Sequence, residues 1–311
     1  MPRISVIIPT HNRPHLLIRA IESARAAATD VEIIVVDDAS TDNTAEVCGQ
    51  LAGIKHVRVE RNQGVAGARN IGIFESSAQY IAFLDDDDLR APGSLDLQAD
   101  VLDRDPGAGF VCGAMIMADQ DYQATGEIIR PRHISGDAFW SLLELDFPVM
   151  PLCALIRKEC FLRVGLLDRN ISSIDDWDMF TRIAELYPVT TIQEAVGIYR
   201  QPTPSSAQGS SARAAQLQLA ARHQLKLLRL PRVAGVPLKE RRLIRKRTIN
   251  RVCDHLIWNA GKNHLPAGKL RPAAANIAVA LKLDPLIPLR PSEYQKVARK
   301  LSERFRGFSN L

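Results

Sequence analysis

The sequence predicts an α/β fold in which a mostly parallel sheet is flanked by helices and followed by a helical C-terminal extension. Runs rich in β-branched residues alternate with helix-like segments over the first hundred residues, which is typical of βαβ units. These runs are almost wholly apolar, as in strands that helices cover on both faces. The charge also changes along the chain: residues 205–311 contain 22 basic and 5 acidic residues, a net charge of +17, whereas residues 1–204 have a net charge of −12.

The first two strands and the helix between them follow from residue periodicity. Residues 4–8 form a β-branched run that ends at Pro9, and residues 31–36 form a second run that is apolar apart from Glu32. Between the two runs, apolar residues recur at the spacing of one helix face: Leu17, Ala20, Ile21 and Ala24. This order predicts a strand, a helix and a second strand.

The same alternation continues to residue 84. Residues 40–44 supply candidate helix caps before a short second helix. Three further elements follow, a strand at 57–59, a helix at 65–77 and a strand at 80–84. Because strand–helix–strand crossovers are right-handed and join parallel strands, we expect these strands to form a parallel sheet.

Residues 110–204 have a looser pattern. Strands are predicted at 110–117, 148–156 and 190–199, with a hairpin through Ile128 after the first strand and a helix at 176–186. The Pro- and Ser-rich segment 201–206 indicates a boundary. We therefore predict one domain at 1–204, with halves at about 1–108 and 109–204, and a second domain at 205–311.

The second predicted domain is basic and helical. Helices are expected at 212–230, 238–258 and 272–283. The second of these has a packing stripe of Ile249, Val252 and Leu256, and the third has an inner face of Ala274, Ile277 and Leu281. The basic charge is densest at 239–247, which favours an anionic surface as a partner.

Composition narrows the class of protein. Of 311 residues, 46% are hydrophobic and 24% are charged, so a collagen-like or largely disordered chain is excluded. The sequence has no run of eighteen apolar residues and no signal-peptide pattern, so we expect neither a transmembrane helix nor secretion. Five scattered cysteines without CxxC spacing favour neither a disulfide framework nor a zinc site. These features predict a cytoplasmic protein.

Two acidic clusters follow predicted strands. Asp37 and Asp38 close the second strand, and residues 85–88, all aspartate, close the fourth. Ligands of parallel sheets bind at the carboxyl ends of strands, so both clusters are expected at one edge of the sheet. Adjacent carboxylates repel one another, which favours a hard divalent cation, Mg²⁺ or Mn²⁺, together with a bound diphosphate. The alternative is a solvated acidic turn.

The segment between the clusters is rich in glycine. Residues 62–72 contain three glycines near a predicted helix start, where glycine permits close approach of the backbone to a ligand. The segment matches neither a G-x-G-x-x-G motif nor a P-loop. Tight packing of the helix on the sheet explains Gly72 equally well.

Four motifs in this order resemble those of the family 2 glycosyltransferases: residues 4–13 (ISVIIPTHNR), 33–44 (IIVVDDASTDNT), 62–72 (NQGVAGARNIG) and 80–88 (YIAFLDDDD) with Pro92. The likeness covers about residues 4–206 and is weaker through 165–168, 175–178 and 199–200. It implies the A-type glycosyltransferase fold and inverting, metal-dependent transfer of a hexosyl or related sugar. The donor would be a nucleotide-diphosphate sugar bound mainly by the first half-domain, with UDP favoured, and the acceptor a hydroxyl group in cell-surface polysaccharide or glycolipid synthesis.

The resemblance also implies roles for individual residues. The nucleotide-sugar pocket would be lined by Pro9, Thr10, Asp37, Asp38 and Gly64, with an aspartate accepting a hydrogen bond from the base. Arg69 would help to hold the nucleotide. In the D-x-D motif, Asp87 and Asp85 would hold the metal, and Asp85 would also lie near the ribose and diphosphate. Asp86, counted with the donor-binding residues, departs from the small residue common in the family, and its charge either points away or adds to metal attraction.

The family's general base lies in an acidic pair before a tryptophan, here Asp175, Asp176 and Trp177. Asp176 matches the base, which takes the proton of the acceptor hydroxyl. The alternative is that both aspartates cap the following helix, with Asp175 nearer the cap. Many members also have a histidine two residues after the position of Arg200; here that role would fall to Arg200, to the serines at 205–206, or to nothing.

Two other functions stay open. A sugar nucleotidyltransferase also places Mg²⁺-binding aspartates at strand ends, but it would be expected to have a Gly-rich basic loop where this chain has residues 9–14 (PTHNRP). The second open function is that of a non-catalytic protein that binds an anionic surface or nucleic acid. Residues 205–311 contain few aromatic side chains for base stacking, so we expect no nucleic acid partner.

The expected partners are a nucleotide-sugar donor and a saccharide or lipid-linked acceptor. Residues 205–311 predict peripheral attachment to the anionic inner face of a membrane. Alternatively, they form a solvated basic face that packs on the acidic first domain or within a dimer.

Overall fold

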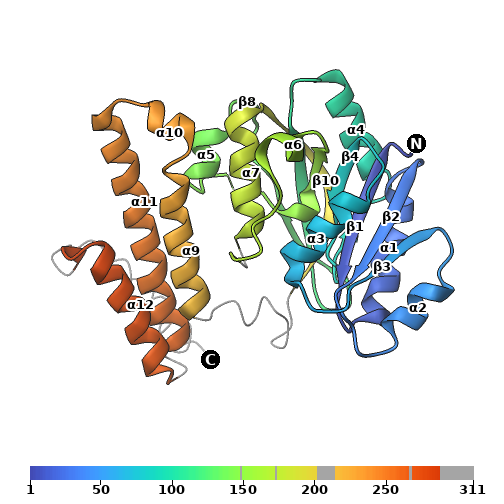
Figure 1. Cartoon of the computed structure of the whole chain (residues 1–311), viewed down its shortest axis with the longest axis horizontal. Helices are drawn as coiled ribbons and strands as arrows, with labels where there is room; N and C mark the ends of the chain where they lie inside the picture. The colour runs from blue at the N-terminus through green and yellow to red at the C-terminus, as the bar shows by residue number, and fades with distance from the viewer. Residues whose placement is uncertain (148, 172–173, 202–213, 266–267, 288–311) are drawn as a thin grey trace. The chain divides into compact units, whose positions relative to one another are not determined.

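The structure of the protein is a computed structural model, and it describes residues 1–147, 149–171, 174–201, 214–265 and 268–287 (Figure 1). The chain divides into two compact units, residues 1–203 and 204–311. Most of the predicted boundary segment 201–206 lies outside the described residues, and the division of the first domain near residue 108 stays a prediction.

The first unit is built on a mixed, mostly parallel sheet flanked by helices, which confirms the predicted fold class. In the described residues, ten strands run in the order β3-β2-β1-β4-β9-β6-β10-β5, with β7 beside β6 and β8 beside β10. The strands are β1 (Ile4–Thr10), β2 (Val31–Asp37), β3 (Ile54–Arg58), β4 (Tyr80–Phe83), β5 (Leu89–Arg90), β6 (Phe110–Ala118), β7 (Ala124–Ile129), β8 (Ser135–Gly136), β9 (Ala154–Arg157) and β10 (Val189–Arg200).

The sheet has two parallel parts joined by one antiparallel strand. β1 pairs in parallel with β2 and β4, and β2 pairs in parallel with β3. β6 and β10 form a second parallel pair. β9 lies between the two parts and is antiparallel to both β4 and β6. The expectation of parallel strands therefore holds for β1 to β4, whereas β5 pairs antiparallel with β10.

Helices cover the sheet of the first unit. They are α1 (Pro14–Ala27), α2 (Thr44–Gln50), α3 (Gly64–Glu75), α4 (Ser94–Arg104), α5 (Phe139–Leu143), α6 (Cys160–Val164) and α7 (Asp175–Leu186). α1 packs on β1, β2 and α4, and α3 packs on β1 and β2. The predicted inner face of α1 is confirmed, because Leu17, Ala20, Ile21 and Ala24 are all fully buried.

The predicted strand at 148–156 is wrong over most of its length. Pro151–Cys153 form a 3-10 turn, and only Ala154–Arg157 enter the sheet, as β9. A proline has no backbone N–H to donate to a strand ladder, so strand pairing begins after it. α4 was not among the predicted helices; it begins after Gly93, which has a left-handed conformation with a φ of 68°.

The contact between α3 and β1 is very close at Gly72. A Cβ atom at this position would lie 2.2 Å from Cγ2 of Ile7, a branched side chain in the middle of β1. There is therefore no room for any side chain, and packing accounts for this glycine.

We expect Gly72→Ala to lower the free energy of unfolding by about 1–3 kcal/mol, because overpacking a well-packed core has a cost of this size. Denaturant unfolding measures the change. The matched control is Gly49→Ala in α2, where a Cβ atom would have no neighbour within 4 Å. The control should be neutral or slightly stabilising, because alanine has the higher helix propensity. Equal stability of the two variants would contradict the steric explanation.

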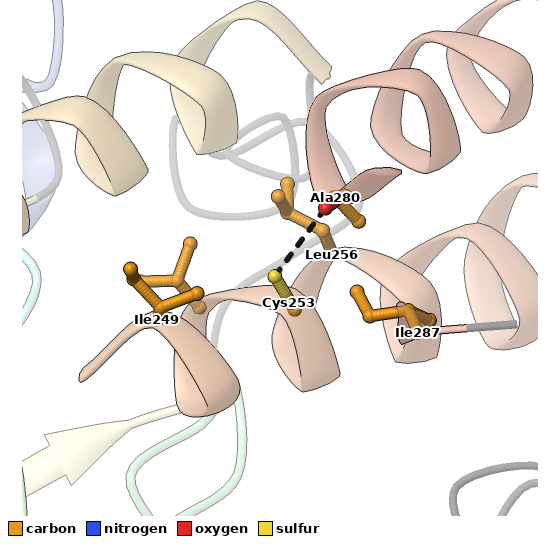
Figure 2. Close-up of a cluster of buried hydrophobic side chains, with 6 residues drawn as sticks. Ile249, Cys253, Leu256, Ala280 and Ile287 are labelled. Atoms are coloured by element: carbon orange, nitrogen blue, oxygen red, sulfur yellow. Dashed lines mark hydrogen bonds between the residues drawn. The ribbon is translucent and has the colours of Figure 1, made fainter. Parts of the chain in front are cut away.

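The second unit is a bundle of helices, namely α9 (Ala214–Leu227), α10 (Pro231–Gly235), α11 (Leu238–Asn259), the π-helical turn η2 (Ala260–His264) and α12 (Leu270–Leu283). The predicted stripe on α11 is confirmed, because Ile249, Val252 and Leu256 are buried in one apolar cluster. Figure 2 shows this cluster, in which the Cys253 thiol of α11 donates to the Ala280 carbonyl of α12 at 3.6 Å.

The inner face predicted for α12 is wrong. Ala273, Asn276 and Ala280 are buried, whereas the predicted residues, Ala274, Ile277 and Leu281, are exposed. The amide of Asn276 donates to the side chain of Asn259 in α11 at 3.2 Å. Small residues at the interface let the two helices approach closely, which turns the larger apolar side chains outward.

Among the described helices, none combines the length and the hydropathy that a membrane span requires.

Candidate active site

Both acidic clusters lie at one edge of the sheet, where β1, β2 and β4 end. Thr10, the last residue of β1, is in register with Asp37, the last residue of β2. The Thr10 hydroxyl also donates to Asp86 Oδ2 at 2.7 Å, which connects β1 to the loop after β4. The prediction of a shared edge is therefore confirmed. We call residues 37–38 and 85–88 together the acidic edge.

Asp37 and Asp38 shape the loops of this edge. The Asp38 carboxylate accepts hydrogen bonds from the backbone N–H groups of Gln63 at 2.6 Å and Gly64 at 2.9 Å, and so fixes the start of α3. Gly64 has a φ of 71°, a conformation that favours glycine. Asp37 is fully buried and accepts the N–H of Ser40 at 2.8 Å. These residues lie beside the buried Pro9 and Thr10 at the ends of β1 and β2, and their assignment to a nucleotide pocket stays a prediction.

The loops after β1 and β2 are bonded to each other. The Asn12 side chain accepts the N–H of Thr41 at 2.7 Å, and the Asn12 N–H donates to the Ser40 hydroxyl at 3.0 Å. Asn12 and Ala39 have φ values of 56° and 62°. Left-handed residues other than glycine are uncommon and cluster at functional sites. The two loops form one fixed wall of the acidic edge.

Asp86 has bonding partners on β1 and in the loop that follows it. Its carboxylate is buried and accepts the Thr10 hydroxyl, and Arg13 Nη1 lies 3.0 Å from both Asp86 Oδ1 and Asp87 Oδ2. Burial raises the pKa of Asp86 to about 7; the charge of Asp87 adds to this effect and Arg13 opposes it.

The other three aspartates could hold a metal ion. Asp85, Asp87 and Asp88 each present a carboxylate oxygen, and these oxygens lie within 4.8 Å of one another. Burial and the neighbouring carboxylates raise the pKa of Asp87 and Asp88. A divalent cation would favour the ionised forms, and an all-oxygen donor set suits a hard cation. These residues therefore fit the predicted Mg²⁺ or Mn²⁺.

Asp88 is a candidate ligand that the sequence analysis did not assign. It is buried and accepts the N–H of Arg200 at 2.9 Å, which connects the end of β10 to the acidic edge. The unbroken run of four aspartates was the only signal for it. The Arg200 side chain donates to the Gln120 carbonyl at 2.7 Å. The serines considered as replacements for the family's histidine lie outside the described residues.

The predicted base lies beside the acidic edge, and Arg69 connects the two. Arg69 Nη2 donates to Asp85 Oδ1 at 2.6 Å, and Arg69 Nη1 lies 3.5 Å from Asp175 Oδ2. Asp176 is half-buried and accepts the N–H of Trp177 at 2.7 Å. Burial raises the pKa of Asp176 to about 6; the charge of Asp175 adds to this effect and Arg69 opposes it. A carboxyl group with this pKa can accept a proton near neutral pH.

The helix-capping alternative for Asp175 does not agree with the structure. Ile174 occupies the N-cap position of α7, and Asp175 is a buried residue of the helix itself that faces Arg69. Trp177 is also buried, and its indole N–H donates to the Leu142 carbonyl at 2.7 Å. Trp177 therefore packs α7 against the segment that contains α5.

Curated relatives of the chain are glycosyltransferases by name. The chain is 29% identical over 185 residues to an uncharacterized glycosyltransferase of Haemophilus influenzae, in an alignment covering 58% of this chain and 62% of that protein. It is 39% identical over 191 residues to an uncharacterized glycosyltransferase of Rickettsia bellii, covering 58% of this chain and 26% of that protein. The chain thus spans less than two thirds of the length of these relatives.

Solved structures with a similar fold include S. aureus TarS. Residues 1–349 of TarS in complex with UDP-GlcNAc superpose with a TM-score of 0.55 and 17% sequence identity, covering 92% of each chain. The same part of TarS in complex with UDP gives a TM-score of 0.54. At this identity, the likeness concerns the fold alone.

Residues 5–164, just over half of the chain, match the family described as glycosyl transferase family 2. The match runs from β1 to α6, so it includes the acidic edge and Arg69 and ends before Asp175 and Asp176. Because the matched residues are those that build the sheet edge, its aspartates and the loops between them, the chain belongs to glycosyl transferase family 2.

Proposed function

We propose that the protein transfers a hexosyl or related sugar from a nucleotide-diphosphate donor, a UDP-sugar, to a hydroxyl acceptor with inversion. The observation that carries this proposal is the arrangement of Asp85, Asp87 and Asp88 around one candidate cation site, with Asp176 close by through Arg69 and Asp175. Family membership supports transfer chemistry. The TarS structures with UDP and UDP-GlcNAc support this class of donor.

The donor would lie across the carboxyl ends of β1, β2 and β4. Pro9, Thr10 and the loops held by Asp37 and Asp38 would surround the nucleotide. Asp85 and Asp87, with Asp88, would hold the divalent metal. When bound, such a metal supplies positive charge that stabilises the leaving diphosphate.

The acceptor would be activated by Asp176. Its carboxylate takes the proton of the acceptor hydroxyl while the hydroxyl oxygen forms a bond to the anomeric carbon of the sugar. The bond between that carbon and the diphosphate oxygen breaks, and the nucleoside diphosphate leaves with the bonding electrons. A single displacement on the face opposite the leaving group inverts the configuration at the anomeric carbon.

The direct test is a screen of nucleotide sugars for donor hydrolysis and transfer in the presence of Mg²⁺ or Mn²⁺. Release of nucleoside diphosphate with an inverted product would support the proposal. Turnover only with a sugar phosphate and a nucleoside triphosphate would make the protein a nucleotidyltransferase. Nucleotide binding without turnover, over a full set of donors and acceptors, would favour a non-catalytic binding protein.

We also propose that the second unit attaches the enzyme to the anionic cytoplasmic face of a membrane, where a lipid-linked acceptor would be found. The first half of α11 exposes six basic residues: Lys239, Arg241, Arg242, Arg245, Lys246 and Arg247. α12 exposes apolar side chains, with Ile277 and Leu281 at 39% and 37% exposure. Basic residues attract an anionic leaflet, and apolar side chains can enter its interfacial region.

A charge-removal variant tests this attachment. Replacing Arg242, Arg245 and Lys246 by Gln should lower binding to anionic vesicles about 10²-fold at low salt, because each basic residue contributes about 1 kcal/mol near such a surface. Flotation with anionic vesicles measures the effect, and binding of the unaltered chain should fall as salt screens the charges. The matched control removes three exposed charges from the first unit, at Arg104, Arg130 and Arg163. Equal recovery on neutral and anionic vesicles would contradict the proposal.

A further inference from the structure

Arg69 lies inside the protein between two segments that carry the proposed chemistry. The side chain comes from α3 and is only 5% exposed. One guanidinium nitrogen donates to Asp85 Oδ1 at 2.6 Å, and the other lies 3.5 Å from Asp175 Oδ2. The guanidinium also lies over the Phe83 ring at 5.5 Å from its centroid. Its two ends therefore contact the donor side and the base side of the site.

The carboxylates around Arg69 stabilise its buried charge. Burial alone would lower the pKa of the guanidinium, but the carboxylates of Asp85, Asp175 and Asp176 outweigh burial and raise it. A buried ion pair contributes little net stability against an apolar replacement, whereas removal of one partner leaves a costly buried charge. Only arginine combines a permanent charge with a planar fork that can reach two carboxylates at once.

We propose that Arg69 is a positioning residue that joins the loop of Asp85 to the first turn of α7 and so fixes the base Asp176 relative to the donor. The inference rests on the proposed function and replaces the role in holding the nucleotide that the family resemblance implies. Both ends of the guanidinium already bind protein carboxylates, and the side chain is too buried to offer a surface to a nucleotide.

In this arrangement, the two aspartates at the start of α7 have different roles. Asp175 is buried against Arg69 and acts as the anchor, whereas the neighbouring Asp176 is half-buried and can reach an acceptor hydroxyl. Asp85 uses one carboxylate oxygen for Arg69, so its other oxygen is the one available to a metal. A shift of α7 by a small distance would then separate base and donor without altering either.

The test compares Arg69→Met, which removes the charge, with Arg69→Lys, which keeps a charge but loses the fork. Arg69→Met should lower kcat at saturating Mn²⁺ by about 10²-fold, the effect of a misplacement near 1 Å, with the Kd for UDP measured without metal changed less than about threefold. Asp176 faces the charges of Asp175, Arg69 and Asp85, and of these three only Arg69 opposes its protonation; the N–H of Trp177 also opposes it, and no Arg69 variant removes that bond. The acidic limb of the pH profile of kcat should therefore move to higher pH in Arg69→Met and stay in place in Arg69→Lys.

The matched control is Arg157→Met. Arg157 is also buried and lies over an aromatic ring, that of Tyr80, but it donates to the carbonyls of Ala108 and Asp105 at the opposite edge of the sheet. Arg157→Met should lower the free energy of unfolding as Arg69→Met does, but the acidic limb of its pH profile of kcat should stay in place. If Arg69→Met does not fold, the double variant Arg69→Met with Asp175→Asn removes both buried charges. Their effects on the pKa of Asp176 oppose each other, so kcat is then the readout: a loss of about 10²-fold with unchanged affinity for UDP supports the positioning role, and an unchanged kcat overturns it.

The outcomes separate the two proposals. A wild-type protein that turns over no nucleotide sugar contradicts the proposed function. An active wild type whose Arg69 variants bind UDP at least tenfold more weakly, with kcat and the pH limb unchanged, overturns the positioning role and returns Arg69 to the nucleotide pocket.

Discussion

Replacing Asp176 by Asn is expected to reduce kcat for sugar transfer by about 10²–10⁴-fold, the range for loss of a positioned proton acceptor. The side chain keeps its size, and the residue does not contact the candidate metal ligands, so affinity for the nucleotide should stay near that of the wild type. Steady-state kinetics with a matched donor and acceptor gives kcat, and calorimetry with UDP gives the affinity.

The pH dependence of kcat tests whether Asp176 acts as a base. Burial, reinforced by the charge of Asp175, raises the pKa of Asp176 to about 6. A base must be deprotonated, so kcat of the wild type should be constant above this pKa and fall as the pH drops through about 6. The residual activity of Asp176→Asn should lack this limb. If Asp175→Asn abolished turnover and the limb while Asp176→Asn kept both, the assignment within the pair would be wrong.

Removal of the metal or of one of its ligands should have an effect of similar size on the donor. A chelator in excess should abolish transfer, and Mn²⁺ or Mg²⁺ should restore it. Loss of groups that only support metal ligands already costs about 10–100-fold in metal affinity. We therefore expect Asp87→Ala to weaken Mn²⁺-dependent UDP binding by at least about 10²-fold, measured by calorimetry with and without the metal.

Two further variants separate the members of the aspartate run. Asp88→Asn should also weaken Mn²⁺ binding, because its carboxylate oxygen lies within 4.8 Å of those of Asp85 and Asp87. Asp86→Asn should affect Mn²⁺ binding less, because Asp86 accepts the Thr10 hydroxyl and is not one of the three aspartates whose oxygens lie together. Full activity of the wild type in excess chelator would overturn the metal-dependent mechanism.

The sequence predicted the first unit well where structure is local. The periodicities of β1, α1 and β2 and the shared edge of the two acidic clusters depend on residues close in the chain and on the rule for parallel strands. β9 could not be placed, because its pairing with β4 and β6 joins residues far apart in the sequence. The two contacts of Arg69 were missed for the same reason, since they join α3 to residues 85 and 175.

The wrong face of α12 has a different cause. A prediction from hydrophobicity places Ile277 and Leu281 at the interface between two helices. The spacing alone cannot reveal that the small residues Ala273 and Ala280 let the two helices approach more closely. The bond between Asn276 and Asn259 then sets the rotation of the helix. Asp86 and Asp88 could not be told apart from the sequence either, because alternate side chains of one aspartate run point in different directions only once the loop has folded.

The close approach of Gly72 to Ile7 has a consequence for redesign of this protein. A Cβ atom at 72 would meet Cγ2, Cγ1 and Cβ of Ile7 at 2.2, 3.0 and 3.1 Å, so the two positions act as a single volume shared by α3 and β1. A larger residue at 72 becomes acceptable only if position 7 shrinks in the same step. Gly72→Ala together with Ile7→Ala removes the contacts at 2.2 and 3.0 Å and leaves the one at 3.1 Å, which a shift of a few tenths of an ångström would relieve. Libraries that vary these positions one at a time would pass through a destabilised intermediate, whereas paired variation would reach the alternative packing directly.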